Sequence, residues 1–171
     1  MSMEIQLKKV EAAGEVEALC RVAKEAWEQA YGELLGPAQV AYMVEKFQSP
    51  AAVRAQMAQD GYQYYLIFGD GQPGGLVGFA PRYEGRDELF LSKLYLLPGL
   101  QGTGAARAAL DFVEAEARRL GLPAIRLTVN KGNTHAAEVY RHFGFETVDA
   151  VVSDIGGGFV MDDYIMVKRL G

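Results

Sequence analysis

The sequence LYLLPGLQGTGAARAAL, Leu94–Leu110, passes from an apolar strand through a glycine-rich turn into an amphipathic helix. Within it, QGTGAA at positions 101–106 has small side chains that leave the backbone open to close approach by a ligand. The helix that follows presents unpaired N–H groups and a partial positive charge at its first turn. A glycine-rich turn between a strand and a helix therefore predicts an anion site that suits a phosphate.

Two familiar nucleotide sites do not fit this turn. No Gly-Lys-Ser or Gly-Lys-Thr sequence follows it, as a Walker A loop requires. A dinucleotide-binding fingerprint follows the first strand of a βα series, whereas this turn follows the fourth expected strand. The remaining interpretations are a phosphate site of another kind and a simple turn at the entry to a helix.

Hydrophobic periodicity outward from this stretch predicts the elements of one mixed sheet and its helices. Apolar residues at three- and four-residue steps indicate helices, and alternating or continuous apolar runs bounded by glycine and proline indicate strands. No linker, low-complexity tract or internal repeat interrupts residues 1–171, so we expect a single α/β (α+β) domain. The expected strands are 4–10, 62–68, 75–82, 87–97, 124–129, 146–155 and 159–168, and the expected helices are 13–31, 38–47, 50–60, 104–120 and 133–143.

The composition indicates a globular protein that does not bind nucleic acid. Of 171 residues, 50% are hydrophobic and 23% are charged, which is close to the average for folded domains. The net charge is −5, and no cluster of lysine and arginine forms the basic face that a nucleic-acid-binding protein needs. An acidic surface weakly favours cationic partners, such as polyamines or lysine side chains.

Metal and disulfide chemistry lack the residues that they need. Cys20 is the only cysteine, and His135 and His142 are the only histidines. They provide neither a disulfide nor a convincing set of zinc ligands, so we expect no metal. Acidic residues stand where a signal peptide would have its apolar segment, and no apolar run is long enough to span a membrane. We expect a cytoplasmic protein that does not bind a membrane.

A second motif lies downstream of the glycine-rich turn. The turn has Gln101, Gly104 and Ala106 in the pattern [QR]-x-x-G-x-[GA], and the stretch at 133–145, NTHAAEVYRHFGF, has the pattern N-x-x-A-x-x-x-Y-x-x-x-G-F. Together and in this order, the two motifs resemble those of the GNAT superfamily of N-acetyltransferases. The resemblance extends from position 75 to the C-terminus, and the closing DDYIMVKRL looks most like the small bacterial amine and polyamine acetyltransferases.

The resemblance implies a mainly antiparallel central sheet of about seven strands flanked by helices, with acetyl-CoA as cosubstrate and no metal. It implies that the turn holds the pyrophosphate and that residues 94–96 offer their backbone to the pantetheine, as to an added strand. The acceptor is then an amine of a small molecule, a polyamine or a protein. The residues implied to contact the cofactor are Leu94, Tyr95, Leu96, Gln101, Gly102, Thr103, Gly104, Ala105, Ala106 and Asn133.

Acetyl transfer to an amine requires that the amine lose a proton and that the departing thiolate be stabilised. The resemblance implies that Tyr140 is the general acid, although its place on a helix face also suits a core aromatic. Glu88 is the candidate general base, because some relatives carry a glutamate on this strand; it also suits a solvated carboxylate. Asn133 has a second interpretation as the N-cap of the helix that follows it.

The acceptor side has candidate residues but no motif. Trp27, Tyr31 and Tyr83 are candidates for the walls of the acceptor pocket, or ordinary core aromatics. Asp162 and Asp163 are candidates for recognising a cationic acceptor, or residues at the entrance to a strand.

Three functions of different kinds fit these observations. The first is an N-acetyltransferase, and the second is a non-catalytic acyl-CoA-binding module or sensor with the same fold. The third is an interaction protein in which QGTGAA is only a turn at the start of a helix. The final pair of strands also suggests a possible homodimer.

Overall fold

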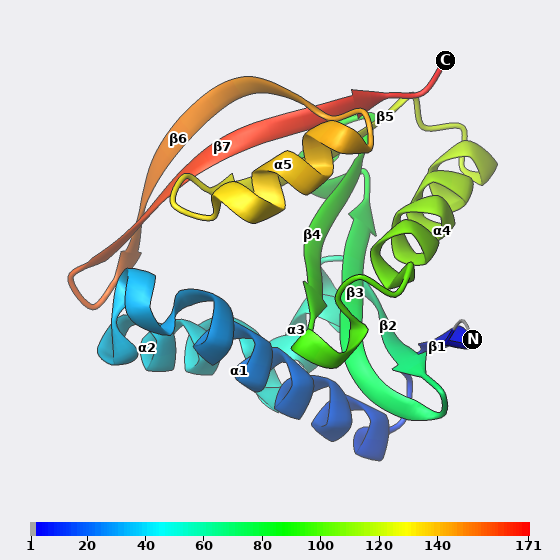
Figure 1. Ribbon diagram of the computed structural model, residues 1–171. Helices are drawn as coiled ribbons and strands as arrows, with labels where there is room; N and C mark the ends of the chain where they lie inside the picture. The colour runs from blue at the N-terminus through cyan, green and yellow to red at the C-terminus, as the bar shows by residue number, and fades with distance from the viewer. Residues whose placement is uncertain (1–2) are drawn as a thin grey trace.

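Seven strands form a single sheet in the order β1-β2-β3-β4-β5-β7-β6 (Figure 1). The computed structural model describes residues 3–171. Neighbouring strands are antiparallel except β4 and β5, which are parallel. The expected mixed, mainly antiparallel sheet is therefore confirmed. The strands are β1 (Ile5–Lys9), β2 (Gln63–Gly69), β3 (Gln72–Pro81), β4 (Leu89–Leu96), β5 (Ala124–Asn130), β6 (Glu146–Gly156) and β7 (Phe159–Arg169).

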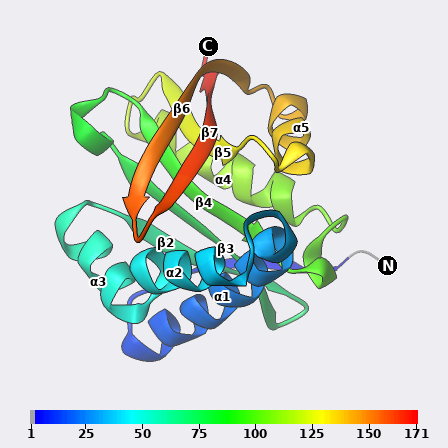
Figure 2. The ribbon, with the colours of Figure 1, turned by 90° about the vertical axis from the view of Figure 1, so that its left-hand side faces the viewer.

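Helices cover both faces of the sheet (Figures 1 and 2). Apolar residues of α1 and α3 pack with those of β2 and β3 in one buried cluster. On the other face, apolar residues of α4 and α5 pack with those of β3, β4 and β5. No helix within residues 3–171 has the length and apolar character needed to cross a membrane. The helices are α1 (Ala13–Leu35), α2 (Pro37–Gln48), α3 (Pro50–Gln59), α4 (Ala105–Arg119) and α5 (Thr134–His142).

The first helix is longer than the sequence predicted. α1 continues through Gly32 to Leu35, because an isolated glycine weakens a helix without necessarily ending it. The helix ends where Gly36 adopts φ +86°, and Pro37 then begins α2. The additional turn brings Leu34 against Gly132, in the loop before α5.

The hairpin between β2 and β3 is tighter than predicted. Its two central residues, Asp70 and Gly71, both have positive φ angles, +49° and +80°, as a type I′ turn requires. β3 consequently begins at Gln72 rather than after the whole glycine-rich segment. The Asp-Gly pair is the local signal for this turn.

The central strands β4 and β5 separate along their length. They pair only through residues 89–90 of β4 and 125–126 of β5. Beyond these pairs, β4 stays bonded to β3 as far as Leu96, and β5 stays bonded to β7 as far as Asn130. Each strand is therefore held firmly on its outer side, while the facing edge of β4 leaves backbone groups available to a ligand.

A bulge in β4 divides its side chains between the two faces of the sheet. The register with β3 shifts at Ser92, so that the residues before and after it do not follow one alternation. Leu94 and Leu96 pack with the cluster that contains α4, whereas Tyr95 packs with the residues of α1. The strand thus contributes to the pocket on one face and to the packing of α1 on the other.

Lys93, on the same strand, is a buried cation that joins β4 to the helical layer. Its side chain is 6% exposed. Its Nζ donates to the carbonyl of Phe47 at 3.0 Å, to Gln56 Oε1 at 3.2 Å and to the Tyr64 hydroxyl at 2.5 Å. Burial lowers the pKa of Lys93 to about 7. The three acceptors fix β4 against the junction of α2 and α3.

The hairpin of β6 and β7 reaches across to α2 (Figure 2). The Tyr42 hydroxyl donates to the carbonyl of Ile155 at 2.8 Å, and Gln39 Nε2 donates to the carbonyl of Val160 at 2.9 Å. The end of the sheet is thereby fastened to the helices on the far side of the β4–β5 opening.

Candidate active site

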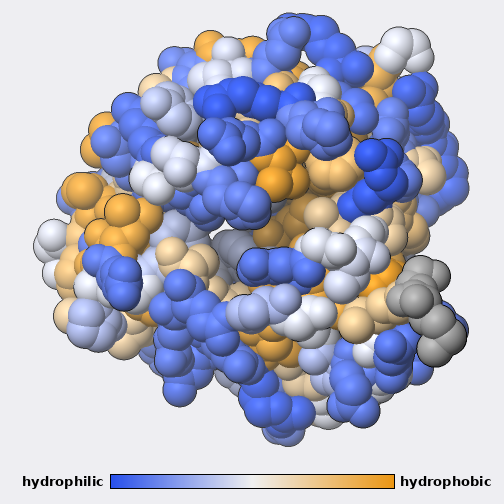
Figure 3. All heavy atoms as spheres, in the orientation of Figure 1, coloured by the Kyte–Doolittle hydropathy of each residue, from blue (hydrophilic) through white to orange (hydrophobic). Residues whose placement is uncertain are grey.

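A pocket of about 780 Å³ lies at the open end of β4, between α1, α4 and α5. In Figure 3 the surface is hollowed between α5 and α1, and hydrophobic residues are visible inside. Most of the candidate site residues from the two sequence motifs line this pocket. Those on its wall are Leu94, Tyr95, Leu96, Gln101, Gly102, Gly104, Ala106, Asn133 and Tyr140.

Two nominated residues of the turn do not line the pocket with their side chains. The Thr103 hydroxyl donates to the carbonyl of Leu100, so it stabilises the turn itself. Ala105, the first residue of α4, is fully buried. Their contribution to a ligand would come from the backbone.

The backbone of the turn is exposed where the sequence predicted an anion site. Gly102 and Gly104 have φ angles of +74° and +89°, which side-chain-bearing residues rarely adopt. A Cβ added at either position would meet no atom within 4 Å, so the space beside them is open. Gly104 is the N-cap of α4 and provides no side-chain acceptor for the first N–H groups of the helix. Those donors remain available to an anion.

Two contacts fix the turn in place. Gln101 Nε2 donates to the carbonyl of Leu96 at 3.2 Å, which ties the turn to the end of β4. The Arg107 guanidinium lies 5.1 Å from the centre of the ring of Phe143, the C-cap residue of α5. Arg107 lines the pocket and adds positive charge to the helix N-terminus.

Asn133 fills the capping role that the sequence suggested. Its Oδ1 accepts a hydrogen bond from the Ala136 N–H at 3.2 Å, at the start of α5. Its Nδ2 donates to the Tyr31 hydroxyl on α1 at 3.0 Å. Because it also lines the pocket, one side chain connects α5, α1 and the wall.

Tyr140 presents a phenol to the pocket from α5. Its ring packs edge-on against Phe145, with the centroids 5.6 Å apart. Burial, and secondarily the phenol of Tyr31, raises the pKa of Tyr140 well above its ordinary value. The Tyr140 hydroxyl therefore keeps its proton near neutral pH.

Trp27 and Tyr31 form an aromatic group behind the pocket. The centroids of their rings are 4.6 Å apart, and the Tyr95 ring lies edge-on to Trp27 at 5.6 Å. Burial raises the pKa of both Tyr31 and Tyr95. Tyr95 belongs to this group and to the pocket wall, so the aromatic group adjoins the pocket.

Asp163 of β7 lies close to this aromatic group. Its side chain is 6% exposed, and its Oδ1 accepts no hydrogen bond from any residue in the range 3–171. Its charge acts on Tyr31, where it opposes ionisation of the phenol. Burial, and secondarily the charge of Asp162, raises the pKa of Asp163 to about 6.

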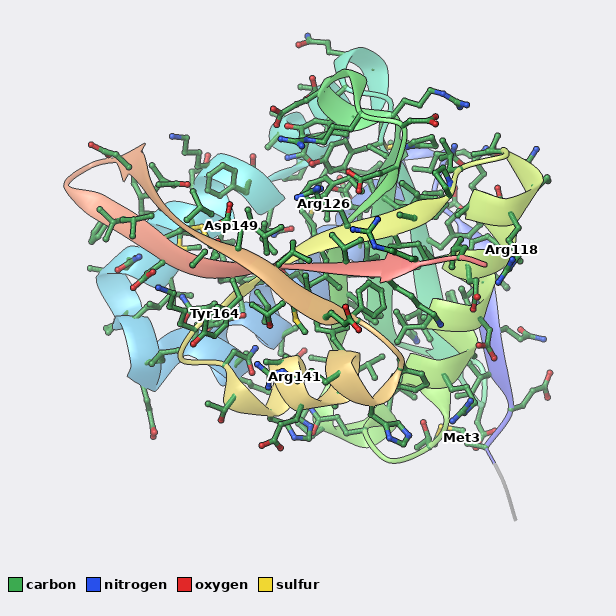
Figure 4. The ribbon with its side chains drawn as sticks, turned by 90° about the horizontal axis from the view of Figure 1, so that it is seen from above. Met3, Arg118, Arg126, Arg141, Asp149 and Tyr164 are labelled. Atoms are coloured by element: carbon green, nitrogen blue, oxygen red, sulfur yellow. The ribbon has the colours of Figure 1, made fainter. Side chains whose placement is uncertain are left out.

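The structure does not bring Glu88 to the pocket. Glu88 precedes β4 at the end where β4 and β5 are paired, and its Oε1 accepts from Arg126 Nε at 2.8 Å. Figure 4 places Arg126 on the opposite side of β7 from α5 and its residue Arg141. Tyr83 is also elsewhere, because its ring stacks on Phe90 at 5.0 Å.

Sequence reasoning missed the part of the wall that α1 supplies. Ala26 and Ala30 line the pocket one helical turn apart. Their spacing and small size were visible in the sequence, but they looked the same as other residues on the apolar face of the helix. Only the packing of α1 against the end of β4 distinguishes them.

The fold and the pocket together define a class of protein, an acyltransferase fold with a glycine-rich turn beside an opened sheet. Residues 17–145 match the family model of the acetyltransferase (GNAT) family. The chain therefore belongs to the GNAT family.

Two bacterial N-acetyltransferases are similar in sequence to part of this chain. An uncharacterised N-acetyltransferase of Mycobacterium bovis is 40% identical over 98 residues, which cover 57% of this chain and 62% of the relative. An uncharacterised N-acetyltransferase of Escherichia coli is 28% identical over 100 residues, covering 58% of this chain and 60% of the relative. The matched part of the chain thus spans about three fifths of the length of each relative.

Solved structures share the fold along nearly the whole chain. The PaiA N-acetyltransferase of Thermoplasma acidophilum, in complex with coenzyme A, superposes with a TM-score of 0.77 at 23% identity, over 99% of this chain and 100% of that one. A GCN5-related N-acetyltransferase of Rhodopseudomonas palustris gives 0.81 at 17% identity, over 99% of each chain. A chimeric spermidine N-acetyltransferase based on that of Vibrio cholerae gives 0.66 at 19% identity, over 96% and 94%.

The raised pKa of Asp163 predicts how stability depends on pH. Between about pH 4 and pH 6 the folded protein holds a proton on Asp163 that the unfolded chain has lost. The free energy of unfolding therefore falls as the pH rises through this window, by up to about 3 kcal/mol in total. Asp163→Asn removes this penalty, so we expect the variant to exceed the parent in stability at about pH 8 and to approach it at about pH 4.

Denaturant titrations at several pH values measure this difference. Asp162→Asn is the matched control, because Asp162 is half-exposed and pairs with Lys131 at 3.0 Å. It should keep most of the pH dependence of the parent, because burial is the larger cause of the raised pKa of Asp163 and the charge of Asp162 is the smaller one. A variant Asp163→Asn that is less stable than the parent at about pH 8 would contradict the prediction.

Proposed function

We propose that this protein is an acetyl-CoA-dependent N-acetyltransferase that acetylates a primary amine. The observation that carries the proposal is the meeting, in one pocket, of the free edge of β4, the glycine-rich turn and the Tyr140 phenol. Two further features support it, the family of the chain and the fold that it shares with N-acetyltransferases.

The residues present fit acetyl-CoA in three places. The N–H groups at the start of α4, with Gly102 and Gly104 beside them, suit the pyrophosphate, and Arg107 supplies positive charge. The edge of β4 at 94–96 suits the amide groups of the pantetheine, in the manner of an added strand. The thioester would then lie near Tyr140 and provide the acetyl group.

The chemistry requires a proton donor and close positioning of the two reactants. Holding an amine beside a thioester allows direct attack without a covalent enzyme intermediate. The Tyr140 hydroxyl, protonated at neutral pH, donates to the sulfur as the carbon–sulfur bond breaks. We propose a small cationic amine or polyamine as acceptor, in keeping with the net charge of −5. A spermidine acetyltransferase is among the proteins that share the fold.

The alternative is a non-catalytic acyl-CoA-binding module. Two measurements separate it from the enzyme. For either function, acetyl-CoA should raise the melting temperature with the logarithm of its concentration above Kd. Release of free CoA thiol with a panel of primary amines should occur only for the enzyme. Binding without thiol release from any amine would favour the module, and the absence of binding would overturn both.

Tyr140→Phe should lower kcat by about 10²-fold, because the variant keeps the ring and loses the proton donor. The Kd for acetyl-CoA should change by less than about threefold, since the glycine-rich turn and the edge of β4 that we propose to bind the cofactor are unchanged. Thiol release and thermal shift measure the two quantities. Tyr83→Phe is the matched control, because Tyr83 lies outside the pocket. An unchanged kcat in Tyr140→Phe would show that Tyr140 only packs.

Gly104→Ala should weaken acetyl-CoA binding by about tenfold or more, equivalent to about 1.4 kcal/mol, because its Cβ stands where the anion approaches. Gly121→Ala is the matched control at the other end of α4, where φ is +72° and the surrounding space is equally open. Both variants should lose about 1 kcal/mol of stability, since both force a side chain into a positive φ. Equal affinities for acetyl-CoA in the two variants would contradict the proposal that the glycine-rich turn binds the pyrophosphate.

We also propose a homodimer that forms along β6. This strand is the outer edge of the sheet and exposes Val148, Val151 and Val152, the last of them 65% exposed. A long apolar edge strand invites pairing with a second copy. Light scattering should give the mass of two chains for the parent and of one chain for Val152→Lys, with the melting temperature checking the fold. A parent of one-chain mass at micromolar concentration would reject the dimer.

A further inference from the structure

Asp163 stands apart from the other buried charged group of the structure. Lys93 is equally buried, but its Nζ has three acceptors, and its cost of burial is offset by hydrogen bonds. Asp163 Oδ1 has none among the described residues. A buried carboxylate oxygen without a partner destabilises a fold, so a structural role does not account for it.

Nearby cations are engaged elsewhere. Lys131 bonds Asp162, the neighbour of Asp163 whose side chain leaves the strand on the other face. Arg126, further along the adjoining strand β5, is paired with Glu88. Among residues 3–171 no cation forms an ion pair with Asp163, and its charge is left for a cation from outside them.

The surroundings of Asp163 suit a small ammonium group. Trp27, Tyr31 and Tyr95 form an aromatic group, with centroids 4.6 Å and 5.6 Å from Trp27. Aromatic faces attract cations, and an adjacent carboxylate adds direct charge pairing. Tyr31 connects this space with the pocket, because its hydroxyl accepts from Asn133 on the pocket wall while its phenol feels the charge of Asp163.

We infer that Asp163 is the acceptor-binding residue and general base of this enzyme, with Trp27, Tyr31 and Tyr95 as the aromatic walls of an ammonium subsite. The inference rests on the proposed acetyltransferase function and specifies its acceptor as a primary alkylamine that arrives as a cation. The subsite lies on the α1 side of the β4–β5 opening. The N-terminus of α4, which we propose to bind the pyrophosphate, lies on the opposite side.

The reaction balances with these residues. Asp163 accepts one proton from the ammonium group, and the freed nitrogen lone pair forms the carbon–nitrogen bond at the thioester carbonyl. The carbon–sulfur bond breaks, and the sulfur receives the Tyr140 proton. The second proton of the nitrogen restores the Tyr140 hydroxyl, and the proton on Asp163 passes to water, leaving an amide, CoA thiol and one free proton.

The test compares acceptors that differ in charge. n-Butylamine is a cation near neutral pH, whereas aniline is neutral and needs neither an anion to bind it nor a base. Asp163→Asn should lower kcat/KM for n-butylamine by about 10²-fold or more. It should change kcat/KM for aniline by less than about threefold. Asp162→Asn, on the next residue, should leave both values within about threefold of the parent.

Two binding measurements complete the test. Asp163→Asn should keep the acetyl-CoA affinity of the parent, which separates this inference from the cofactor site. In the presence of CoA, it should bind n-butylamine at least about tenfold more weakly than the parent, a readout that applies even if aniline is a poor substrate. An equal loss with both amines, or undiminished activity and binding with n-butylamine, would overturn the inference. If the parent releases thiol with no amine, the proposed function itself fails.

Discussion

The separation of β4 from β5 is the constraint around which the rest of the structure is arranged. A strand edge in the middle of a sheet normally satisfies its N–H and C=O groups with its neighbour, and leaving them unpaired in a packed interior is costly. Here the unpaired edge faces a pocket instead. Backbone hydrogen bonds of β4 with β3, and of β5 with β7, hold the two strands on their outer sides. The Lys93 side chain bonds β4 to the helical layer. These contacts fix the positions of β4 and β5, and so they maintain the opening between the two strands.

The two sides of the β4–β5 opening differ in electrostatic character. At the glycine-rich turn, the first N–H groups of α4 and the Arg107 guanidinium provide positive potential. On the α1 side, the Asp163 carboxylate provides a negative charge. The hydrogen bond from Asn133 to Tyr31 joins these halves, since it ties α5 to α1 across the opening. Such polarity suits a reaction between a phosphate-bearing donor and a cationic acceptor, with the Tyr140 phenol between them.

The two buried charged side chains of the structure, Lys93 and Asp163, differ in whether they have hydrogen-bond partners. Lys93 and Asp163 both have a pKa displaced by burial. Lys93 reaches a carbonyl, an amide and a phenol, so its burial serves the architecture. Asp163 Oδ1 reaches no partner in the described chain, so its burial leaves the folded state less stable than an apolar or neutral side chain would. This cost is consistent with the acceptor-binding role that we infer for Asp163.

The sequence by itself determined the order of the elements, the mixed sheet, the family, and the Asn133 cap, because these depend on short-range signals. Apolar periodicity, a positive φ at glycine and a capping side chain act within a few residues of chain. It misjudged the end of α1 and the β2–β3 turn, where neighbouring glycines offered several stops. The tertiary structure alone showed that Glu88 pairs with Arg126, 38 residues away, and that Asn133 bonds Tyr31, 102 residues away. Two adjacent aspartates that look alike in sequence, Asp162 and Asp163, lie on opposite faces of one strand, one paired at the surface and the other buried and unpaired. Burial and partnership come from segments remote along the chain, so no local pattern encodes them.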